Sequence, residues 1–571
     1  MFSKVYKVFL TASISLLMLR LVNLQLIHGS FFYNMSVNNY LRVLPLSGFR
    51  GNILDRYGQE LAGNRLSFVI QVLPDRIIDK NEVFNIVAEE FNLDVSEVEA
   101  VYKKRFKAPF SPLTLVDNVA IRKALLFKEK YRDISGLLVS EDIKRYYFYD
   151  SVASHVLGYL GEISDEELIE LKPYGYRYSS LIGKSGIEKT LEPYLKGTDG
   201  GMLVKVDNRG RIIEVLSREN PERGLDVYLT LDLNLQKKAE ELMSGKQGCF
   251  LAMDVKTAEV IVFVSNPGFN PNVFLNSQDH DVEALLNSKT QPFFNRAIQA
   301  EYPLGSIFKL LVATAGLEEG SIAPGAKFFC PGFFDFKGRK YKCWKEEGHG
   351  WQNLRDAVVH SCNVYFYQAG LKVGVKDIVS YSKKFGFGEK TGIDLPYESS
   401  GFLPSPDWKL KQTKEIWYPG DTINLSIGQG YLLVTPVQVL RFIAAIANGG
   451  YMVTPVVCKS ISGEKTYRKE AEKLSINSKT LNLVRDGMRG VVNDPTGTGQ
   501  LARVGGFVSG KTATAQTPLG NSHAWFTGFA PYKNTEIVFL VFVEHGGGGG
   551  FVAARMAREF LQYYFDKDSE K

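Results

Sequence analysis

Tyr302-Pro303-Leu304-Gly305-Ser306-Ile307-Phe308-Lys309 is the stretch that decides the fold of this 571-residue chain. Its proline and glycine stop any helix upstream. An apolar run from Leu310 to Ala315 follows, so the pattern predicts a buried helix that begins near Ser306 and ends at Gly320. Ser306 and Lys309 are three residues apart and share one face of that helix. Free backbone N–H groups at the helix start favour an oxyanion beside Ser306, and burial lowers the pKa of a lysine, so the pair is a candidate nucleophile and base.

Two further short motifs follow in the order expected for one serine-nucleophile site. In Ser361-Cys362-Asn363 the side chains alternate, so Ser361 and Asn363 point into one cleft, where they can relay a proton and hold a substrate amide. In Lys511-Thr512-Ala513-Thr514, on a predicted strand, Lys511 supplies positive potential and the hydroxyls of Thr512 and Thr514 can bind a carboxylate. The N–H of Thr514 can complete an oxyanion hole with that of Ser306. Each motif alone also fits an ordinary cap, loop or edge strand, but the three together predict one active site.

The elements expected around these motifs give an α+β fold. Strands are predicted at both ends of the second half of the chain, with helices between them, which indicates an antiparallel sheet flanked by helices. The predicted elements are a hairpin at 249–255 and 259–265, a helix at 435–449, strands at 506–516, 523–530 and 536–544, and a last helix at 552–565.

The N-terminus carries a candidate membrane anchor. Lys4 and Lys7 precede an apolar run at residues 8–27, which is long enough as a helix to cross a bilayer. The run ends without the small residues of a cleavage site, so we interpret it as an uncleaved transmembrane helix. A buried amphipathic helix is the alternative, which Arg20 would suit. Because lysines precede the run and residues 21–41 contain no Lys or Arg, the N-terminus is expected in the cytoplasm and the rest outside it.

Composition sets the broad class of the protein. Apolar residues make up 45% and charged residues 23%, which is typical of folded protein. The net charge of +6 comes without a dense basic stripe, which argues against a nucleic-acid partner. We expect an anchor at 1–28, an elongated mixed pedestal or dimerisation-type domain at 29–225, and a catalytic domain at 226–571. In the pedestal, Ser96 and Glu99 are predicted to form a capping box.

The three motifs resemble those of penicillin-binding proteins and serine β-lactamases. The anchor and long pedestal look like a class B penicillin-binding protein, and further motifs resemble the penicillin-binding protein 2 group. Those motifs are Arg50-Gly51-x-Ile53-x-Asp55-Arg56-x-Gly58, Gly348-His349-Gly350, Lys390-Thr391-Gly392-Ile393-Asp394, Trp417-Tyr418-x-Gly420-Asp421-Thr422, Gly428-Gln429-Gly430 and Thr435-Pro436-x-Gln438. One departure is Ala513, where the family usually has glycine, and an added methyl there is expected to narrow the cleft or shift the strand.

The resemblance implies a D,D-transpeptidase of cell-wall elongation and cell-shape maintenance in the inner membrane, with its catalytic domain in the periplasm. Ser306 would attack the D-Ala-D-Ala bond of a peptidoglycan stem peptide, and a neighbouring stem's amine would take the acyl group. The resemblance also implies acylation by β-lactams, and partnership with a SEDS-family glycosyltransferase and other elongation-complex proteins.

Cys330, Cys343, His349 and Cys362 are spaced as C-x12-C-x5-H-x12-C. Three thiolates and an imidazole suit structural Zn²⁺. A disulfide between Cys330 and Cys343 and inert buried thiols are the alternatives. Members of the penicillin-binding protein 2 group carry zinc in this region, so the resemblance favours the metal.

Two other functions fit parts of the pattern. A β-lactam-hydrolysing enzyme would need a carboxylate that activates water, and none stands out. A non-catalytic penicillin-binding sensor or scaffold would not need the complete set of motifs. Hydrolysis of the acyl-enzyme by water would make the protein a carboxypeptidase.

Overall fold

A computed structural model describes residues 2–46, 48–106, 109, 112–178, 180–207, 212–275, 279–466, 469–517 and 520–569. Contacts divide the chain into two compact units. The first holds residues 1–51, 64–145 and 196–225, and the second holds residues 52–63, 146–195 and 226–571. The expected domain boundaries at residues 28 and 225 stay a prediction. In the division by contacts, segments 52–63 and 146–195 group with the second unit.

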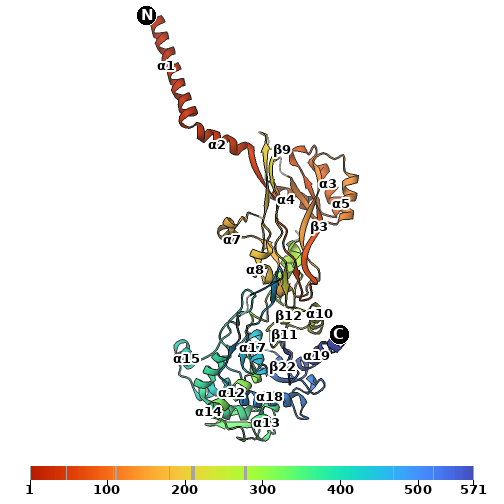
Figure 1. Ribbon diagram of the computed structural model, residues 1–571, viewed down its shortest axis with the longest axis vertical. Helices are drawn as coiled ribbons and strands as arrows, with labels where there is room; N and C mark the ends of the chain where they lie inside the picture. Colours follow the sequence, from red (N-terminus) through yellow and green to blue (C-terminus); the bar gives the residue numbers. More distant parts are fainter. Residues whose placement is uncertain are drawn as a thin grey trace. The chain divides into compact units, whose positions relative to one another are not determined.

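The chain begins with a long apolar helix. Helix α1 (Phe2–Val22) continues through a π-helical turn (Asn23–Ile27), and α2 (Gly29–Tyr40) follows (Figure 1). Residues Lys4–Ile27 have a mean hydropathy of 1.7, and none of this window is buried, so the segment is a candidate membrane span by length and composition.

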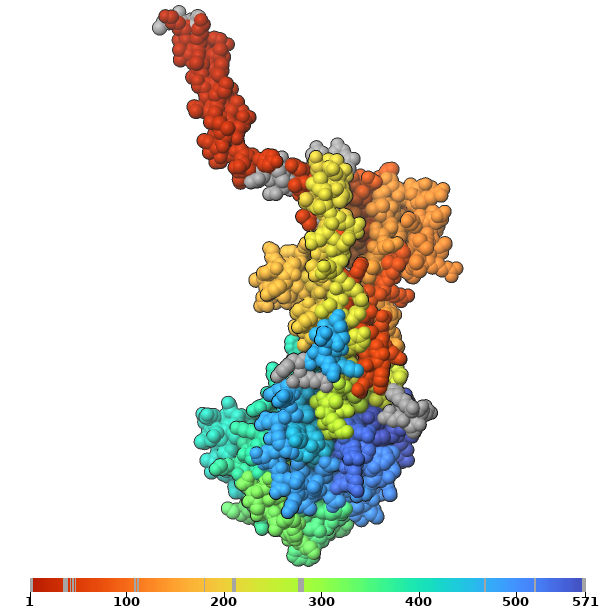
Figure 2. Space-filling view, in the orientation of Figure 1, coloured from red at the N-terminus to blue at the C-terminus, as the bar shows by residue number. Residues whose placement is uncertain are grey.

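The rest of the first unit contains two sheets. Strands β1 (Leu41–Leu46), β8 (Gly200–Val206) and β9 (Ile212–Glu219) form one antiparallel sheet, with β9 at its edge and exposed along its whole length (Figure 2, yellow). In the other, β3 (Glu60–Val72) pairs with β4 (Leu113–Val119) and β5 (Leu137–Tyr147). Helices α3 (Lys80–Phe91), α4 (Val95–Arg105) and α5 (Ile121–Lys130) share a hydrophobic core with this sheet.

The predicted capping box of the pedestal is wrong by two residues. Helix α4 is capped by Asp94, whose partner is Glu97 rather than Glu99. Both registers satisfy the same sequence pattern. The structure has the first of them, and the helix buries Val98 and Tyr102 in the core.

The second unit is built around a five-stranded antiparallel sheet. Its order is β12-β11-β23-β22-β21, with β11 at Gly248–Asp254, β12 at Val260–Asn266, β21 at Ser509–Ala515, β22 at His523–Ala530 and β23 at Ile537–Val543. Every residue of β22 and β23 is buried, so both faces must be covered. One helix group is α10 (Leu233–Met243) with α19 (Val552–Ser569). The other contains α12 (Lys309–Glu318), α17 (Pro436–Ala447) and α18 (Ser478–Asn493) (Figure 1).

The fold class and the main elements predicted from the sequence are confirmed. The predicted hairpin is β11 and β12, paired antiparallel, and the three late strands and the last helix are β21, β22, β23 and α19. Helix α17 begins at Pro436, and a capping box of Thr435 and Gln438 holds its start.

The Arg50–Gly58 motif includes a turn held by polar contacts. Within the second unit, the Asp55 carboxylate accepts hydrogen bonds from the N–H of Tyr57 at 2.8 Å and of Gln59 at 2.9 Å, and Arg56 pairs with Glu259 at 3.1 Å.

The other elements are β2 (Ile53–Leu54), α6 (Ser154–Leu157), β6 (Leu160–Glu162), α7 (Asp165–Leu171), β7 (Leu181–Gly183), α8 (Gly186–Thr190), α9 (Glu192–Leu195), β10 (Val227–Leu229), α11 (Asp279–Leu286), β13 (Phe328–Cys330), β14 (Phe333–Phe336), β15 (Arg339–Lys342), β16 (Gly350–Gln352), α13 (Leu354–Val359), α14 (Asn363–Lys384), α15 (Pro406–Thr413), α16 (Pro419–Leu425), β17 (Tyr451–Met452), β18 (Cys458–Ile461), β19 (Glu464–Lys465) and β20 (Glu472–Lys473).

Candidate active site

Ser306 lies at the start of a buried helix. It occupies a single 3-10 turn, Gly305–Ile307, that leads directly into α12. Gly305 has a φ of +62°, a conformation that suits glycine, and its N–H donates to the carbonyl of Gly428 at 2.8 Å. A Cβ on Gly428 would lie 2.2 Å from the Gly305 carbonyl oxygen, so glycine is needed at residue 428 for this close approach. The Ser306 side chain is half-buried and makes no hydrogen bond to any described residue.

The Lys309 amine joins the first motif to the second. Lys309 is fully buried, and its Nζ donates to the Ser361 carbonyl at 2.8 Å, to Asn363 Oδ1 at 2.6 Å and to Ser361 Oγ at 3.3 Å. Burial lowers the pKa of Lys309 to about 8, because the charged form loses its hydration. The amine therefore contacts the Ser361–Asn363 motif rather than the Ser306 hydroxyl.

Lys511 reaches the same hydroxyl from the edge strand β21. Its Nζ donates to Ser361 Oγ at 2.9 Å and to the Thr512 carbonyl at 3.0 Å. Burial lowers the pKa of Lys511 well below its usual value, and the nearby charge of Lys309 lowers it further. Ser361 itself has a φ of +52°, which strains a residue with a side chain and is common at functional sites.

Strand β21 also lies directly against the Ser306 turn. A Cβ built on Gly305 would be 3.4 Å from the Cβ of Ala513, which is 2% exposed. The methyl group of Ala513 thus lies where it would be in van der Waals contact with a side chain at residue 305. The three short motifs, separated by more than 200 residues of sequence, meet at one place.

The two threonines of the third motif have different surroundings. Thr512 is buried, and its hydroxyl is 2.9 Å from that of Thr498. Thr514 is exposed, and its Oγ1 accepts the N–H of Gly549 at 3.3 Å. No motif in the sequence identifies Thr498. The only signal is its place in a Thr- and Gly-rich turn after α18.

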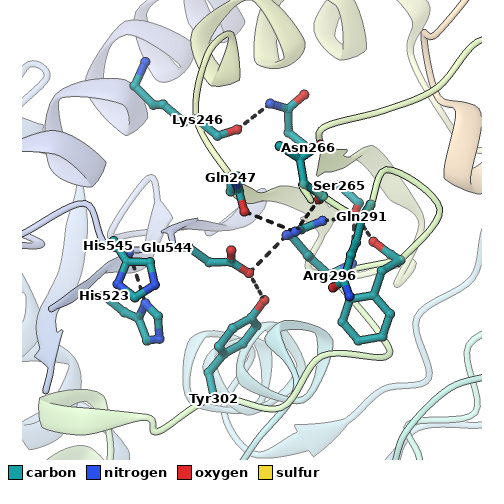
Figure 3. A network of polar contacts seen from close by, with 12 residues as sticks. Lys246, Gln247, Ser265, Asn266, Gln291, Arg296, Tyr302, His523, Glu544 and His545 are labelled. Carbon is teal, nitrogen blue, oxygen red and sulfur yellow. Dashed lines mark hydrogen bonds and ion pairs between the residues drawn. The ribbon is translucent and has the colours of Figure 1, made fainter. Parts of the chain in front are cut away.

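A buried polar network anchors the segment that precedes Ser306 (Figure 3). Arg296 pairs with Glu544 at 3.0 Å, with side-chain exposures of 4% and 16%, and the hydroxyl of Tyr302 donates to the same carboxylate. Tyr302 also exchanges two backbone hydrogen bonds of 2.9 Å with Val434. The chain segment that leads to Ser306 is therefore held in place by a buried ion pair as well as by backbone hydrogen bonds.

The four candidate metal ligands lie together in the structure. The ligand atoms of Cys330, Cys343, His349 and Cys362 are all within 4.8 Å of one another, and none of the cysteines forms a disulfide. His349 Nδ1 is 3.6 Å from Cys330 Sγ and 3.5 Å from Cys343 Sγ. Tetrahedral zinc with Zn–S of about 2.3 Å and Zn–N of about 2.0 Å would separate such atoms by about 3.6 Å, so the donor set fits the ion.

Comparisons with known proteins cover almost the whole chain. Residues 248–562 match the model of the penicillin binding protein transpeptidase domain, and residues 45–229 match that of the penicillin-binding protein dimerisation domain. The peptidoglycan D,D-transpeptidase MrdA of Haemophilus influenzae is 33% identical over 95% of this chain and 88% of its own length.

Two solved structures are similar over comparable lengths. Penicillin-binding protein PBP2 of Helicobacter pylori, solved in complex with MreC, has a TM-score of 0.81 and 32% identity, over 92% of this chain and all of the other. A chain from a peptidoglycan synthase complex, described as coordinating polymerization and crosslinking, has a TM-score of 0.75 and 30% identity, over 99% of this chain and 98% of the other.

Proposed function

The chain belongs to the penicillin-binding protein 2 group of peptidoglycan D,D-transpeptidases, and on this premise we propose that Ser306 is its acylated nucleophile. In the first step Ser306 Oγ bonds to the carbonyl carbon of the penultimate D-Ala of a donor stem. The D-Ala-D-Ala amide bond breaks, and the serine proton passes to the leaving amine. In the second step an acceptor amine attacks the ester, the C–Oγ bond breaks, and a proton returns to Ser306.

Lys309 is the proposed base, because burial brings the pKa of its amine to about 8. The amines of Lys309 and Lys511 both contact the Ser361 hydroxyl, and Ser361 passes protons from these amines to the leaving group. Asn363 holds a substrate amide. Lys511 supplies positive potential. The exposed hydroxyl of Thr514, with Thr512 behind it, binds the terminal carboxylate, and the N–H groups of Ser306 and Thr514 form the oxyanion hole.

One observation carries this assignment: the amines of Lys309 and Lys511 meet on the hydroxyl of Ser361, beside the turn that holds Ser306. A fluorescent penicillin tests it. The wild-type chain is expected to form a long-lived adduct that maps to Ser306, and Ser306→Ala should abolish labelling without a change in thermal midpoint. Labelling of Ser306→Ala at the wild-type rate would refute the nucleophile.

The same experiment separates the alternatives. A β-lactam-hydrolysing enzyme would turn the adduct over quickly, and a scaffold would not label. A carboxypeptidase would release D-Ala from stem peptides equally fast with and without an acceptor amine, whereas a transpeptidase forms crosslinked product when the acceptor is present.

We also propose that Cys330, Cys343, His349 and Cys362 hold a structural Zn²⁺. The four residues would fill the tetrahedral coordination of the ion, so the ion would have a structural role and take no part in the reaction. Cys362 lies between Ser361 and Asn363, so the ion would fix the second motif. Elemental analysis should find about one zinc per chain, lost in Cys343→Ser and in His349→Ala. A disulfide between Cys330 and Cys343 in mass spectra would contradict the site.

The membrane arrangement and the partners complete the proposal. The apolar N-terminal helix anchors the chain in the inner membrane with its N-terminus in the cytoplasm and the transpeptidase domain in the periplasm. Because the relative solved with MreC and the relative from the synthase complex are similar over nearly the whole chain, we expect this chain to work beside elongation-complex proteins and a SEDS-family glycosyltransferase. Protease protection of an N-terminal tag in sealed inverted vesicles would contradict this orientation.

A further inference from the structure

A cationic hairpin adjoins the second catalytic motif. Strands β14 and β15 pair antiparallel, so that Phe333 is opposite Lys342 and Asp335 is opposite Lys340. The turn between them is Lys337-Gly338, with φ values of +54° and +81°. Both turn residues have the positive φ of a tight two-residue hairpin turn, which fixes the register and therefore which side chains face outward.

The inner face of the hairpin packs against the helix that carries Asn363. The rings of Phe334 and Tyr341 lie 6.4 and 5.7 Å from the ring of Tyr367 on α14. The Lys342 carbonyl accepts the Tyr367 hydroxyl at 3.1 Å and Asn363 Nδ2 at 3.5 Å. Since Asn363 Oδ1 in turn accepts the Lys309 amine, the hairpin backbone is two hydrogen bonds away from the proposed base.

The outer face carries two exposed lysines, Lys340 and Lys342, which lie opposite Asp335 and Phe333 and form no ion pair with any described residue. Three further exposed cations lie nearby, also without an ion pair to any described residue: Lys337 in the turn, Arg339 opposite Phe336 on the inner side, and Lys345 after the hairpin. Lys340 instead lies over the exposed ring of Phe333 at 4.7 Å. Asp335, the one acidic residue in that span, accepts the N–H of Gly338 at 3.1 Å. Two glutamates follow at 346 and 347, after the hairpin ends.

We propose that this outer face binds the carboxylates of the acceptor stem peptide during crosslinking. The inference rests on the proposed function, in which the donor's terminal carboxylate is held on β21 and the donor is covalently attached to Ser306 when the acceptor enters. The acceptor must be held by other residues while its amine reaches the ester. It carries carboxylates, and Lys340 and Lys342 are complementary to them, on a hairpin whose backbone contacts Asn363.

The experiment compares two acceptors and two enzyme steps. The full-length chain in detergent is given a D-Ala thioester donor and an acceptor stem peptide whose carboxylates are either free or amidated. We expect the wild-type chain to use the free-carboxylate acceptor with a kcat/KM about tenfold higher, since several exposed charge pairs each contribute modestly. Lys340→Glu/Lys342→Glu should remove this preference. Raising the salt concentration should reduce the preference of the wild type, because exposed charges are screened.

The acylation step provides the internal control. Second-order acylation by a fluorescent penicillin requires no acceptor and should stay within about twofold of wild type in Lys340→Glu/Lys342→Glu. Lys383→Glu/Lys384→Glu, which reverses two exposed charges at the opposite end of α14, should keep both the acylation and the acceptor preference. A hairpin variant that retains the preference, or loses it together with acylation, overturns the acceptor site. A wild-type chain that is never acylated refutes the proposed function instead.

Discussion

Replacing Ala513 by glycine restores the residue usual in the family, and we expect it to leave acylation almost unchanged while destabilising the transpeptidase unit. Ala513 is 2% exposed, and a Cβ built on Gly305 would lie 3.4 Å from the Ala513 Cβ. That distance is an ordinary van der Waals contact. Because the methyl group is buried beside the Ser306 turn, we expect that it does not narrow an open cleft.

The magnitude follows from what the substitution removes. Loss of one buried methyl costs about 0.8 kcal/mol, and glycine in a strand costs about 0.5–1 kcal/mol more in backbone entropy. A total of about 1.5 kcal/mol should lower the thermal midpoint of the unit by several degrees. Acylation by a fluorescent penicillin should stay within about threefold, or about 0.65 kcal/mol. Gly305→Ala is the matched contrast: a side chain at a φ of +62° costs about 1–2 kcal/mol and acts directly on Ser306, so acylation should fall about tenfold. If Ala513→Gly instead accelerates acylation tenfold, the methyl obstructs the cleft and the reasoning fails.

Three further predictions concern buried charges. Burial holds the pKa of Lys309 at about 8, so acylation, which needs the neutral amine, should rise with pH and level off above about pH 8, and a flat profile from pH 6.5 to 9 would contradict this. Glu544→Ala should lower the thermal midpoint more than Tyr302→Phe, because breaking a buried ion pair costs about 3–5 kcal/mol and losing one hydrogen bond to a carboxylate about 1.5–3 kcal/mol. Burial lowers the pKa of His155 from 6.5 to about 4. Below pH 6.5 the unfolded chain binds a proton here that the folded chain does not. The free energy of unfolding should therefore keep its full value above pH 6.5 and fall by up to about 3 kcal/mol as the pH drops to 4. His155→Phe should remove that loss, as seen by comparing midpoints at pH 5 and pH 7.

Local sequence was sufficient wherever one segment decides the structure. The apolar run after Lys309 forms α12, buried as expected, and Thr435 with Gln438 forms the expected cap of α17. The predicted cap of α4 was wrong because Asp94 and Ser96 both satisfy the same pattern, so the pattern alone does not choose between them. Local pattern specifies that a helix exists better than it specifies the residue where the helix begins.

Contacts between distant segments could not be predicted in the same way. Arg296 and Glu544 are 248 residues apart, and Thr498 is recognisable only once β21 brings Thr512 to it. Neither contact leaves a spacing in the sequence, because each is made by the packing of helices and loops on the central sheet. For the same reason, the pattern that predicted a Lys309 base for Ser306 did not predict that the amine would be held by the second motif.

The sharing of one hydroxyl by two buried amines has a consequence for the order of proton transfers. Lys309 and Lys511 both contact Ser361 Oγ. Two adjacent buried ammonium groups are strongly unfavourable because neither is hydrated. In the state of lower energy, one amine is therefore neutral and the other is charged. The neutral amine accepts a hydrogen bond from Ser361 while the charged one donates to it. When the charged lysine passes a proton to Ser361 Oγ and the Ser361 hydroxyl proton passes to the neutral lysine, the two lysines exchange roles. A proton taken from Ser306 through Lys309 can in this way reach the leaving amine without a second buried charge being created, which explains why a strained serine, rather than a more favourable glycine or asparagine, occupies the positive-φ position at residue 361.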